Sequence, residues 1–356
     1  MLRTIDTGVI SKAIEEMCIE ANHFLSEDMK ECLGCAAENE KSPLGRQILS
    51  QLQENLQIAG DEMIPICQDT GMAVVFVKAG QDVHFEGGSL TEAINEGVRN
   101  GYVNGFLRKS VVNDPIYREN TKDNTPAVIH YEITLDKPIK PLRIGMASDL
   151  HLGKLFGGKE LDKLADIMQQ EKVDIILLPG DIMDDNVNAY LAEKMQPHLA
   201  KLKAPMGVYA TLGNHDLFGD QDRIDREIRK AGITVLRDET LTLNNELVLI
   251  GRNDNLAHDR PSTETLLKQV NTDLPIILLD HRPTDIEKHA SLPLDIQVSG
   301  HAHKGQVFPA SLITKMMYRL DYGHEKIGNP HVFVTSGYGF WGIPMRLGSQ
   351  SEVIII

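Results

Sequence analysis

Hydrophobic and polar positions follow two different patterns along this chain, and the pattern changes near residue 138. In the first stretch, apolar side chains recur every three or four residues, as on one face of a helix, and two further apolar runs indicate strands. The predicted helices are 10–21, 44–56 and 89–100, and the predicted strands are 73–77 and 125–134. Ser89, with Glu92 three residues later, matches a capping box at the start of the third helix.

A short polar segment with two prolines, residues 135–141, separates the two patterns. Proline lacks an amide hydrogen and keeps the preceding residue extended, so the pair interrupts regular structure. At 356 residues the chain is also longer than one hydrophobic core usually supports. We therefore predict a smaller α+β fragment over 1–133, a linker over 134–141 and a second domain over 142–356.

Beyond the linker, short and fully apolar runs alternate with helical segments, as in sheets that helices cover. The predicted strands are 142–147, 173–178, 207–212, 233–236, 247–250, 276–279, 296–299 and 332–336, and the predicted helices are 159–171, 189–202 and 222–231. The pattern predicts an α/β domain of layered sheets flanked by helices.

Polar residues gather just past the carboxyl ends of these strands, where layered α/β folds bind their ligands. The five polar segments are 149–151, 180–184, 213–216, 280–283 and 300–303. Asp149 and His151 lie two apart in an expected extended segment, so they project to one side and can reach one ion. A single segment of this kind is more often a turn or a solvated loop. Five in order at strand ends predict a shared site, because buried Asp and His are costly unless paired or metal-bound.

These segments read D-L-H, G-D-I-M-D, G-N-H-D, D-H-R-P and G-H-A-H, and together they resemble the calcineurin-like metallophosphoesterase family over about residues 140–356. The resemblance implies two divalent cations. The first would be held by Asp149, His151, Asp181 and His303, and the second by Asp181, Asn214, His281 and His301. Asp181 would bridge the two. Cations about 4 Å apart can share a hydroxide and clamp phosphoryl oxygens during in-line attack on a phosphoester.

The residue types fit this chemistry. Imidazole and carboxylate ligands suit Mn²⁺, Zn²⁺ or Fe, and the absence of thiolates argues against a closed structural zinc site. His215 is the candidate for protonating the leaving alkoxide or stabilising the transition state, oriented by Asp216. Asp216 can equally be a hydrogen-bonding support behind the ligands, a role that we also give to Asp184. Arg252 and Asn253 follow a strand and could contact phosphate oxygens, although a solvated loop is the alternative.

The substrate is harder to predict. An apolar patch near the end of the chain consists of Ile313, Met316, Met317, Tyr318 and Leu320. Such a stripe is more often core, which we favour, but Met-rich surfaces can also grip acyl chains. The segment 337–342 resembles a bacterial subgroup of the family whose members are often membrane-associated. A lipid-linked phosphoester is therefore an alternative to a small soluble one.

In the first stretch, the sequence IPICQDTG at 64–71 resembles the N-terminus of class I fumarate hydratase, an iron–sulfur hydro-lyase, over about residues 1–133. The resemblance implies that Cys67 ligates a cluster and that Gln68, Asp69 and Arg108 contact a dicarboxylate. Such a cluster needs three protein cysteines, and no cysteine follows Cys67. We therefore expect no iron–sulfur cluster and no hydratase activity from this fragment alone.

Composition narrows the remaining choices. A net charge of −15 without a basic stripe argues against nucleic acid as a partner. We find no apolar run near the roughly 20 residues of a membrane span and no signal peptide. Four cysteines, all in the first fifth of the chain, fit a reducing compartment. We predict a cytoplasmic protein, peripheral to a membrane if its substrate is a lipid.

Three functions therefore compete. The leading one is hydrolysis of a phosphomonoester or phosphodiester by two metals. The second is fumarate or tartrate hydration, in which another subunit supplies the missing cluster ligands. In the third, the first fragment is an adaptor that tethers the phosphoesterase to hydratase subunits.

Overall fold

The computed structural model covers residues 1–356 and describes all of them except 1–2, 69–70, 81–82, 113–117 and 136. The described chain forms two compact units, of which the larger contains residues 130–356 and the smaller contains 4–76 and 85–129. The division at 129/130 falls inside strand β4 (Val128–Thr134) and so precedes the proline-rich joint. Tyr131, in the second half of β4, contacts the rings of His324 and Phe333, which explains why this half belongs to the larger unit.

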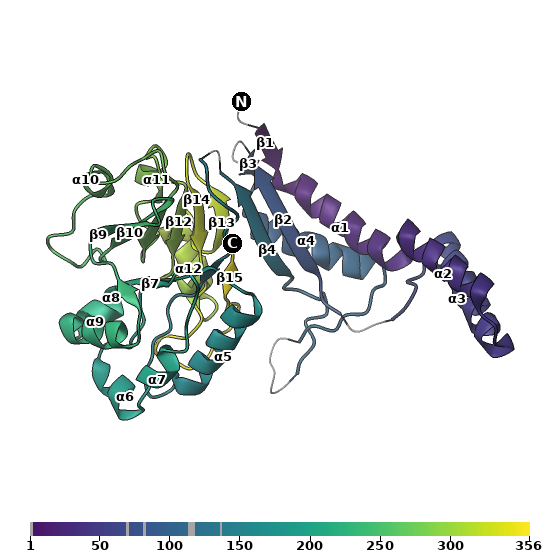
Figure 1. The fold of residues 1–356 in the computed structure, drawn as a ribbon, viewed down its shortest axis with the longest axis horizontal. Helices are drawn as coiled ribbons and strands as arrows, with labels where there is room; N and C mark the ends of the chain where they lie inside the picture. Colours follow the sequence, from purple (N-terminus) through teal and green to yellow (C-terminus); the bar gives the residue numbers. More distant parts are fainter. Residues whose placement is uncertain (1–2, 69–70, 81–82, 113–117, 136) are drawn as a thin grey trace. The chain divides into compact units, whose positions relative to one another are not determined.

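The larger unit contains two stacked sheets with helices on their outer faces (Figure 1). The five-stranded sheet has the order β15 (Ile354–Ile355), β5 (Ile144–Met146), β6 (Ile175–Pro179), β7 (Val208–Thr211), β8 (Thr234–Val235). The six-stranded sheet has the order β13 (Gly323–Lys326), β14 (His331–Val334), β12 (Ile296–Ser299), β11 (Ile276–Asp280), β10 (Leu247–Arg252), β9 (Glu239–Leu243). Inner strands pair in parallel, whereas β9, β13 and β15 are antiparallel at the edges.

Helices cover these sheets because their apolar stripes face inward, as Leu161, Leu164 and Met168 of α5 do. The helices of this unit are α5 (Gly158–Gln170), α6 (Val187–Ala192), α7 (Gln196–Leu199), α8 (Asn214–Phe218), α9 (Gln221–Lys230), α10 (Thr263–Leu267), α11 (Ile286–His289), α12 (Ala310–Met317) and the 3-10 turn η1 (His303–Gly305). The predicted fold class of layered sheets flanked by helices is confirmed.

In the larger unit, two local predictions are wrong. The single helix predicted over 189–202 is two short helices, α6 and α7, because Lys194 has a left-handed backbone (φ 52°) and Pro197 begins a new helix. The extended segment predicted through Asp149 and His151 is also absent, since β5 ends at Met146 and both residues have positive φ. The two side chains come together through a left-handed turn instead.

The smaller unit is built around two closely packed helices, α1 (Thr7–His23) and α4 (Leu90–Asn104). Glycines on α4 allow this approach, because a Cβ at Gly97 would lie 2.4 Å from the carbonyl oxygen of Ser11. Ser89 precedes α4, but its side chain makes no capping hydrogen bond, so the predicted capping box is wrong. Two strand pairs complete the N-terminal region: β1 (Arg3–Asp6) with β3 (Val83–Glu86), and β2 (Val74–Gly80) with β4.

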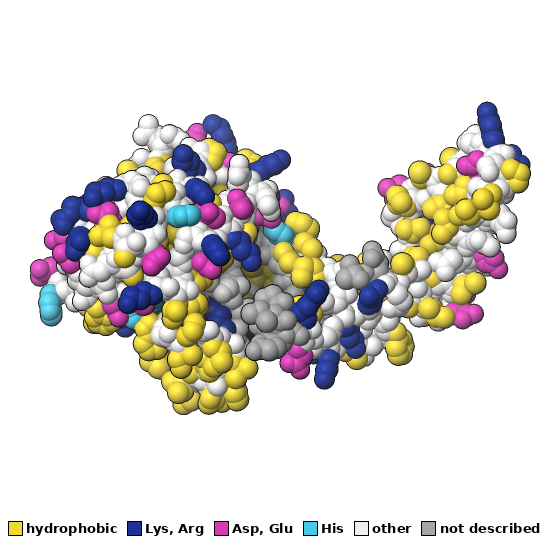
Figure 2. Space-filling view, turned by 90° about the horizontal axis from the view of Figure 1, so that it is seen from below, with side chains coloured by type: hydrophobic (Ala, Val, Ile, Leu, Met, Phe, Trp, Pro, Cys, Tyr) yellow, Lys and Arg dark blue, Asp and Glu magenta, His cyan; other side chains and the backbone are white. Residues whose placement is uncertain are grey.

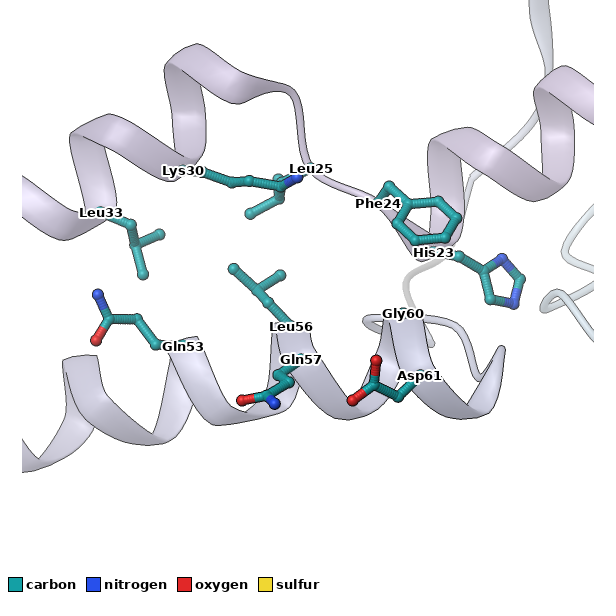
Figure 3. A pocket seen from close by; sticks show the side chains of 10 residues that line it. All are labelled: His23, Phe24, Leu25, Lys30, Leu33, Gln53, Leu56, Gln57, Gly60 and Asp61. Atoms are coloured by element: carbon teal, nitrogen blue, oxygen red, sulfur yellow. The ribbon is translucent and has the colours of Figure 1, made fainter.

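Helices α2 (Glu27–Asn39) and α3 (Pro43–Glu62) form a hairpin that exposes most of its apolar side chains. Figure 2 shows hydrophobic side chains gathered on this hairpin. A groove of about 450 Å³ runs between the two helices and the end of α1, lined by residues such as Phe24, Leu33 and Leu56 (Figure 3). The described helices include none with the length and apolar character needed to cross a membrane.

Candidate metal centre

The structure brings the seven predicted metal ligands together at the carboxyl ends of β5, β6, β7, β11 and β12. We call these residues the ligand cluster: Asp149, His151, Asp181, Asn214, His281, His301 and His303. All are buried except His301, which is half-buried. Asp149, His151 and His303 form one group whose ligand atoms lie within 4.8 Å of one another, and Asp181, His281 and His301 form a second.

Within the first group, His303 Nε2 lies 3.2 Å from Asp149 Oδ1 and 3.1 Å from His151 Nε2. His151 Nε2 also lies 3.8 Å from Asp181 Oδ2, which links this group to the other. In the second group, His281 Nε2 lies 3.1 Å from Asp181 Oδ2 and 3.2 Å from the side-chain oxygen of Asn214. The two groups are therefore contiguous at Asp181.

These separations fit donors that share a cation. Two atoms that each lie roughly 2.0–2.2 Å from one ion, at octahedral to tetrahedral angles, are about 2.8–3.6 Å apart. Four of the separations in the ligand cluster fall in this interval. Nε2 of His151 and Nε2 of His303 face each other, and their two lone pairs cannot form a hydrogen bond with each other. A cation between them is a better partner for both nitrogens. The donor set of nitrogen and carboxylate oxygen suits a divalent ion of the first transition row.

The backbone at the ligand cluster is unusual. Five of the seven residues have left-handed φ angles between 45° and 69°, namely Asp149, His151, Asp181, His301 and His303. Such conformations cost free energy in non-glycine residues and persist where the surrounding structure holds them. Glycines supply the room, since a Cβ at Gly300 would lie 2.2 Å from Asp149 Oδ2 and one at Gly213 would lie 2.1 Å from Asp181 Oδ1.

The carboxylates of the ligand cluster stay ionised despite burial. Burial by itself would raise the pKa of Asp149, but the charges of His303 and His281 outweigh it and hold that pKa well below its usual range. The pKa of Asp181 is also lowered, because attraction to His281 exceeds the effect of burial. Two anionic side chains are thus available to cations at the centre of the site.

The two histidines of the second group differ in charge in the metal-free protein. Burial would lower the pKa of His281, but the charge and hydrogen bond of Asp181 raise it to about 10. Burial together with the charges of His281 and Arg282 lowers the pKa of His301 to about 3. His301 therefore offers a free lone pair at neutral pH, whereas His281 must lose a proton before it can bind a metal.

Comparison with known proteins identifies the family. The calcineurin-like phosphoesterase family model matches residues 142–305, and the fumarate hydratase (fumerase) model matches residues 11–148. An uncharacterized metallophosphoesterase of Aquifex aeolicus is 35% identical over 225 residues, which cover 60% of this chain and 84% of that protein. The chain belongs to the calcineurin-like metallophosphoesterases. It carries a fumarate hydratase-like region ahead of the phosphoesterase domain.

Other relatives of this metallophosphoesterase are matched over a smaller share of their length. An uncharacterized metallophosphoesterase of Helicobacter pylori strain J99 is 30% identical over 262 residues, 71% of this chain. The chain spans 65% of the length of that relative, just under two thirds. The crystal structure of TT1561 of Thermus thermophilus has 14% sequence identity and a TM-score of 0.38, covering 56% of this chain and 92% of that chain, a likeness too low for any functional argument.

His215 lies at the edge of the ligand cluster, but its partner differs from the one predicted. Asp185 Oδ1 lies 2.5 Å from His215 Nδ1. Asp216 instead accepts hydrogen bonds from the backbone N–H groups of Gly213, Ile182 and Met183, so it holds the loops together and does not orient the imidazole. Burial and the charge of Asp181 raise the pKa of Asp216 to about 6.

Asp184 lies near the ligand cluster, with Oδ1 at 3.7 Å from His151 Nδ1. This position suits the supporting role predicted for it. Sequence reasoning missed Asp185, although the signal was present: D-D follows G-D-I-M, and either acid can face His215 once the turn is left-handed at Asp185.

The predicted phosphate contacts, Arg252 and Asn253, lie outside the ligand cluster. Arg252 donates to Asp280 at 2.9 Å and approaches Asp285 at 3.4 Å, and the whole guanidinium is buried. Asn253 donates from its side-chain amide to Asp238 at 2.7 Å. Among the described residues, neither side chain makes a hydrogen bond or ion pair with the ligand cluster, and both instead hold the end of β10 in place.

The apolar patch at 313–320 is not core, contrary to our preference from the sequence. Met316 is 88% exposed, Ile313 and Met317 are exposed as well, and only Leu320 is buried. Tyr318 connects this surface to the centre, because its ring lies 6.1 Å from that of His301. The α12 surface is thus an exposed apolar face, linked through Tyr318 to His301 of the ligand cluster.

A second apolar element borders the site from the segment 337–347. Trp341, 54% exposed, has its ring 5.8 Å from that of His215. Buried Gln306 holds this segment, donating to the carbonyl oxygens of Trp341 and Ile343 and accepting from the Trp341 N–H. Arg346 donates to the carbonyl oxygens of Ser336 and Gly337 behind it. Sequence reasoning overlooked both polar anchors.

The predicted hydratase residues form no comparable site. Cys67 is exposed, and Arg108 donates to the backbone oxygen of Gln68 at 2.9 Å. Asp69 lies outside the described residues. Cys18, on α1, packs against Gly101 of α4, and burial raises its pKa to about 11. In the part of the chain that the structure describes, no group of candidate metal ligands includes a cysteine.

Proposed function

We propose that the larger unit hydrolyses a phosphomonoester or phosphodiester with two divalent cations, Mn²⁺, Zn²⁺ or Fe, held by the ligand cluster. One observation supports this proposal above all. Two groups of nitrogen and oxygen donors share one carboxylate, that of Asp181, at separations suited to cations. Asp149, His151 and His303 complete one set with Asp181. Asn214, His281 and His301 complete the other.

The chain's own residues have distinct tasks in this proposal. When bound, the cations supply a nucleophilic hydroxide and offset charge that develops on the phosphoryl oxygens. Asp181 bridges the two sets and keeps them at a fixed separation. His215 donates a proton from Nε2 to the leaving oxygen, while Asp185 accepts from Nδ1–H and so fixes the tautomer. Trp341 beside His215 restricts water at that position.

The test combines metal analysis with a substrate panel. Protein purified, stripped with chelator and reloaded with Mn²⁺ should bind two equivalents and hydrolyse 4-nitrophenyl phosphate or bis(4-nitrophenyl) phosphate. The stripped protein should be inactive on both. Activity that survives complete metal removal, or a stoichiometry of zero, contradicts the proposal.

A finer proposal concerns the substrate's leaving group, which we propose is lipid-linked. The exposed apolar face of α12, next to His301, supports it, together with the apolar segment around Trp341. Acyl chains bury apolar surface that water otherwise covers. We also propose a cytoplasmic protein that docks at the periphery of the membrane. Equal rates on a soluble aryl phosphate and on the same phosphate carrying an acyl chain count against the lipid.

A separate proposal concerns the smaller unit as an adaptor. Its α2–α3 hairpin exposes apolar residues such as Leu44, Ile48 and Leu52 along one helix, a surface that suits a protein partner. Co-purification of tagged protein with hydratase subunits tests this idea, and a monodisperse monomer in their presence rejects it. We do not propose hydro-lyase activity, since the exposed Cys67 has no cysteine partner among the described ligand groups.

A further inference from the structure

Arg282 is a cation beside the ligand cluster that the proposed reaction has not yet used. It follows His281 directly in the chain, so its backbone starts at a metal ligand. Its Nε donates to Asp254 Oδ2 at 2.5 Å. Asp254 is fully buried and also accepts from the backbone N–H of Leu256 at 3.0 Å, which fixes the carboxylate. The Nε end of the Arg282 guanidinium is therefore held in one place.

The two terminal nitrogens of Arg282 remain available. Among the described residues they have no hydrogen-bond or ion-pair partner, and the side chain is 22% exposed. Its neighbours differ: the terminal nitrogens of Arg252 and Arg260 donate to Asp280. An arginine that is anchored through Nε keeps its two terminal nitrogens available, and their N–H groups can donate to a phosphoryl oxygen.

Arg282 lies on the side of the ligand cluster that His301 and Tyr318 share. The positive charge of Arg282 acts on both of these groups, and the charge of Asp254 acts on His281 and Tyr318. Coulomb interactions weaken with distance, so these groups are neighbours in space. The Arg282–Asp254 pair therefore lies near the second ligand group, on the side where Tyr318 approaches His301.

We propose that Arg282 binds a non-bridging phosphoryl oxygen of the substrate and makes this protein prefer phosphomonoesters over phosphodiesters. The inference rests on the proposed function. A monoester carries close to two negative charges at pH 7 and above and offers three terminal oxygens. A diester carries one charge and offers two such oxygens. If cations take two oxygens, a third charged oxygen exists only in the monoester, and Arg282 is its partner.

The experiment compares Arg282→Gln with the full-length wild type, both loaded with Mn²⁺, on 4-nitrophenyl phosphate and bis(4-nitrophenyl) phosphate. Loss of a charge-assisted contact should lower kcat/KM for the monoester by on the order of 10²-fold. The diester value should change by less than about fivefold, because the variant removes little that the diester uses. Equal losses on both substrates, or no loss on either, overturn the proposal.

Arg237→Gln is the matched control. Arg237 is 24% exposed and also pairs with carboxylates, but it uses a terminal nitrogen, and its partners Asp222 and Asp225 lie on α9. This variant should leave the ratio of the two kcat/KM values unchanged. Arg282→Lys keeps the charge without the fork, so the ratio should recover only in part. Thermal unfolding and Mn²⁺ content must match wild type in all three variants.

Direct binding separates this inference from the proposed function. Inorganic phosphate titrated into Mn²⁺-loaded protein should bind wild type and the Arg237→Gln variant with the same affinity, and Arg282→Gln at least about tenfold more weakly. If wild type hydrolyses neither ester yet shows this difference, the proposed hydrolysis fails and Arg282 still binds phosphate. If phosphate binds all variants alike, the inference about Arg282 fails whatever the activity.

Discussion

The two compact units treat polar and apolar side chains in opposite ways. The larger unit buries six of the seven residues of the ligand cluster, at the ends of its strands. The α2–α3 hairpin of the smaller unit buries only Ala59 and leaves large apolar side chains exposed. Burying carboxylates and imidazoles is expensive unless something compensates them. The contrast locates chemistry in the larger unit and an unused apolar surface in the smaller one.

If the larger unit carries the chemistry, a substitution at Asp181 should have the largest effect on hydrolysis. Asp181→Asn removes the carboxylate that both ligand groups share, so kcat/KM should fall by more than the 10- to about 100-fold typical of residues behind the ligands. Steady-state hydrolysis and Mn²⁺ content measure it. Asp162→Asn is the control, since Asp162 pairs with His198 and Lys201 on the surface of α5. A wild-type rate in Asp181→Asn removes the bridging role.

The second largest effect that we expect is the dependence of metal affinity on pH. The pKa of His281 is raised to about 10 in the metal-free protein, so its pairing with Asp181 contributes stability below pH 6.5 that is lost as the pH rises through 10. A cation must displace that proton. The apparent Mn²⁺ affinity should therefore rise about tenfold per pH unit between pH 7 and 9. Calorimetric titration measures it, and His281→Gln should flatten the slope; a flat wild-type profile contradicts the assignment.

A pair of glycine substitutions compares the packing of the two units. In Gly300→Ala the new Cβ meets Asp149 Oδ2 and Ser148 Oγ at 2.2 Å, so we expect roughly 1–3 kcal/mol of destabilisation and a loss of bound Mn²⁺. In Gly34→Ala, within α2, the Cβ meets nothing within 4 Å, and helix propensity should stabilise by roughly 0.5–1 kcal/mol. Denaturant unfolding followed by circular dichroism distinguishes them. Equal changes of the same sign in the free energy of unfolding would show that the two glycines are packed alike.

The smallest effect is expected at the exposed methionines. Met316→Ser on α12 should reduce hydrolysis of an acylated aryl phosphate about fivefold, the equivalent of a partly lost apolar contact, without changing the rate on the soluble aryl phosphate. Met29→Ser on α2 should change neither rate, since that exposed methionine belongs to the smaller unit. Equal sensitivity of both substrates to Met316→Ser rejects a lipid-binding role for α12.

Much of the larger unit could be predicted from its sequence, because fully apolar runs such as Ile175–Pro179 and Ile276–Asp280 admit few alternatives to a buried strand. The gathering of the ligand residues was also predictable, since carboxyl ends of parallel strands meet at one edge. The backbone conformation that brings these residues together was not predictable. Left-handed turns at Asp149 and His151 replace the extended segment because surrounding contacts, which no local pattern records, decide their φ angles.

Burial of amphipathic stretches was the weaker part of the prediction. The patch at 313–320 has the composition of a core helix, but α12 is short and only one of its faces meets the rest of the unit. Likewise, Arg252 ends β10 and Arg282 lies just past β11. Only the positions of Asp280 and Asp254 decide that the terminal nitrogens of Arg252 are paired and those of Arg282, among the described residues, are not. Such outcomes depend on contacts between residues far apart in the chain.

Trp341 is the single tryptophan in the sequence, and Gln306 clamps its backbone at the border of the metal site. The indole emission of the whole protein therefore originates from one place, about 6 Å from His215. A paramagnetic ion or a nitroaromatic inhibitor bound there would quench that light. The molecule thus carries its own optical probe, positioned to report occupancy without a label.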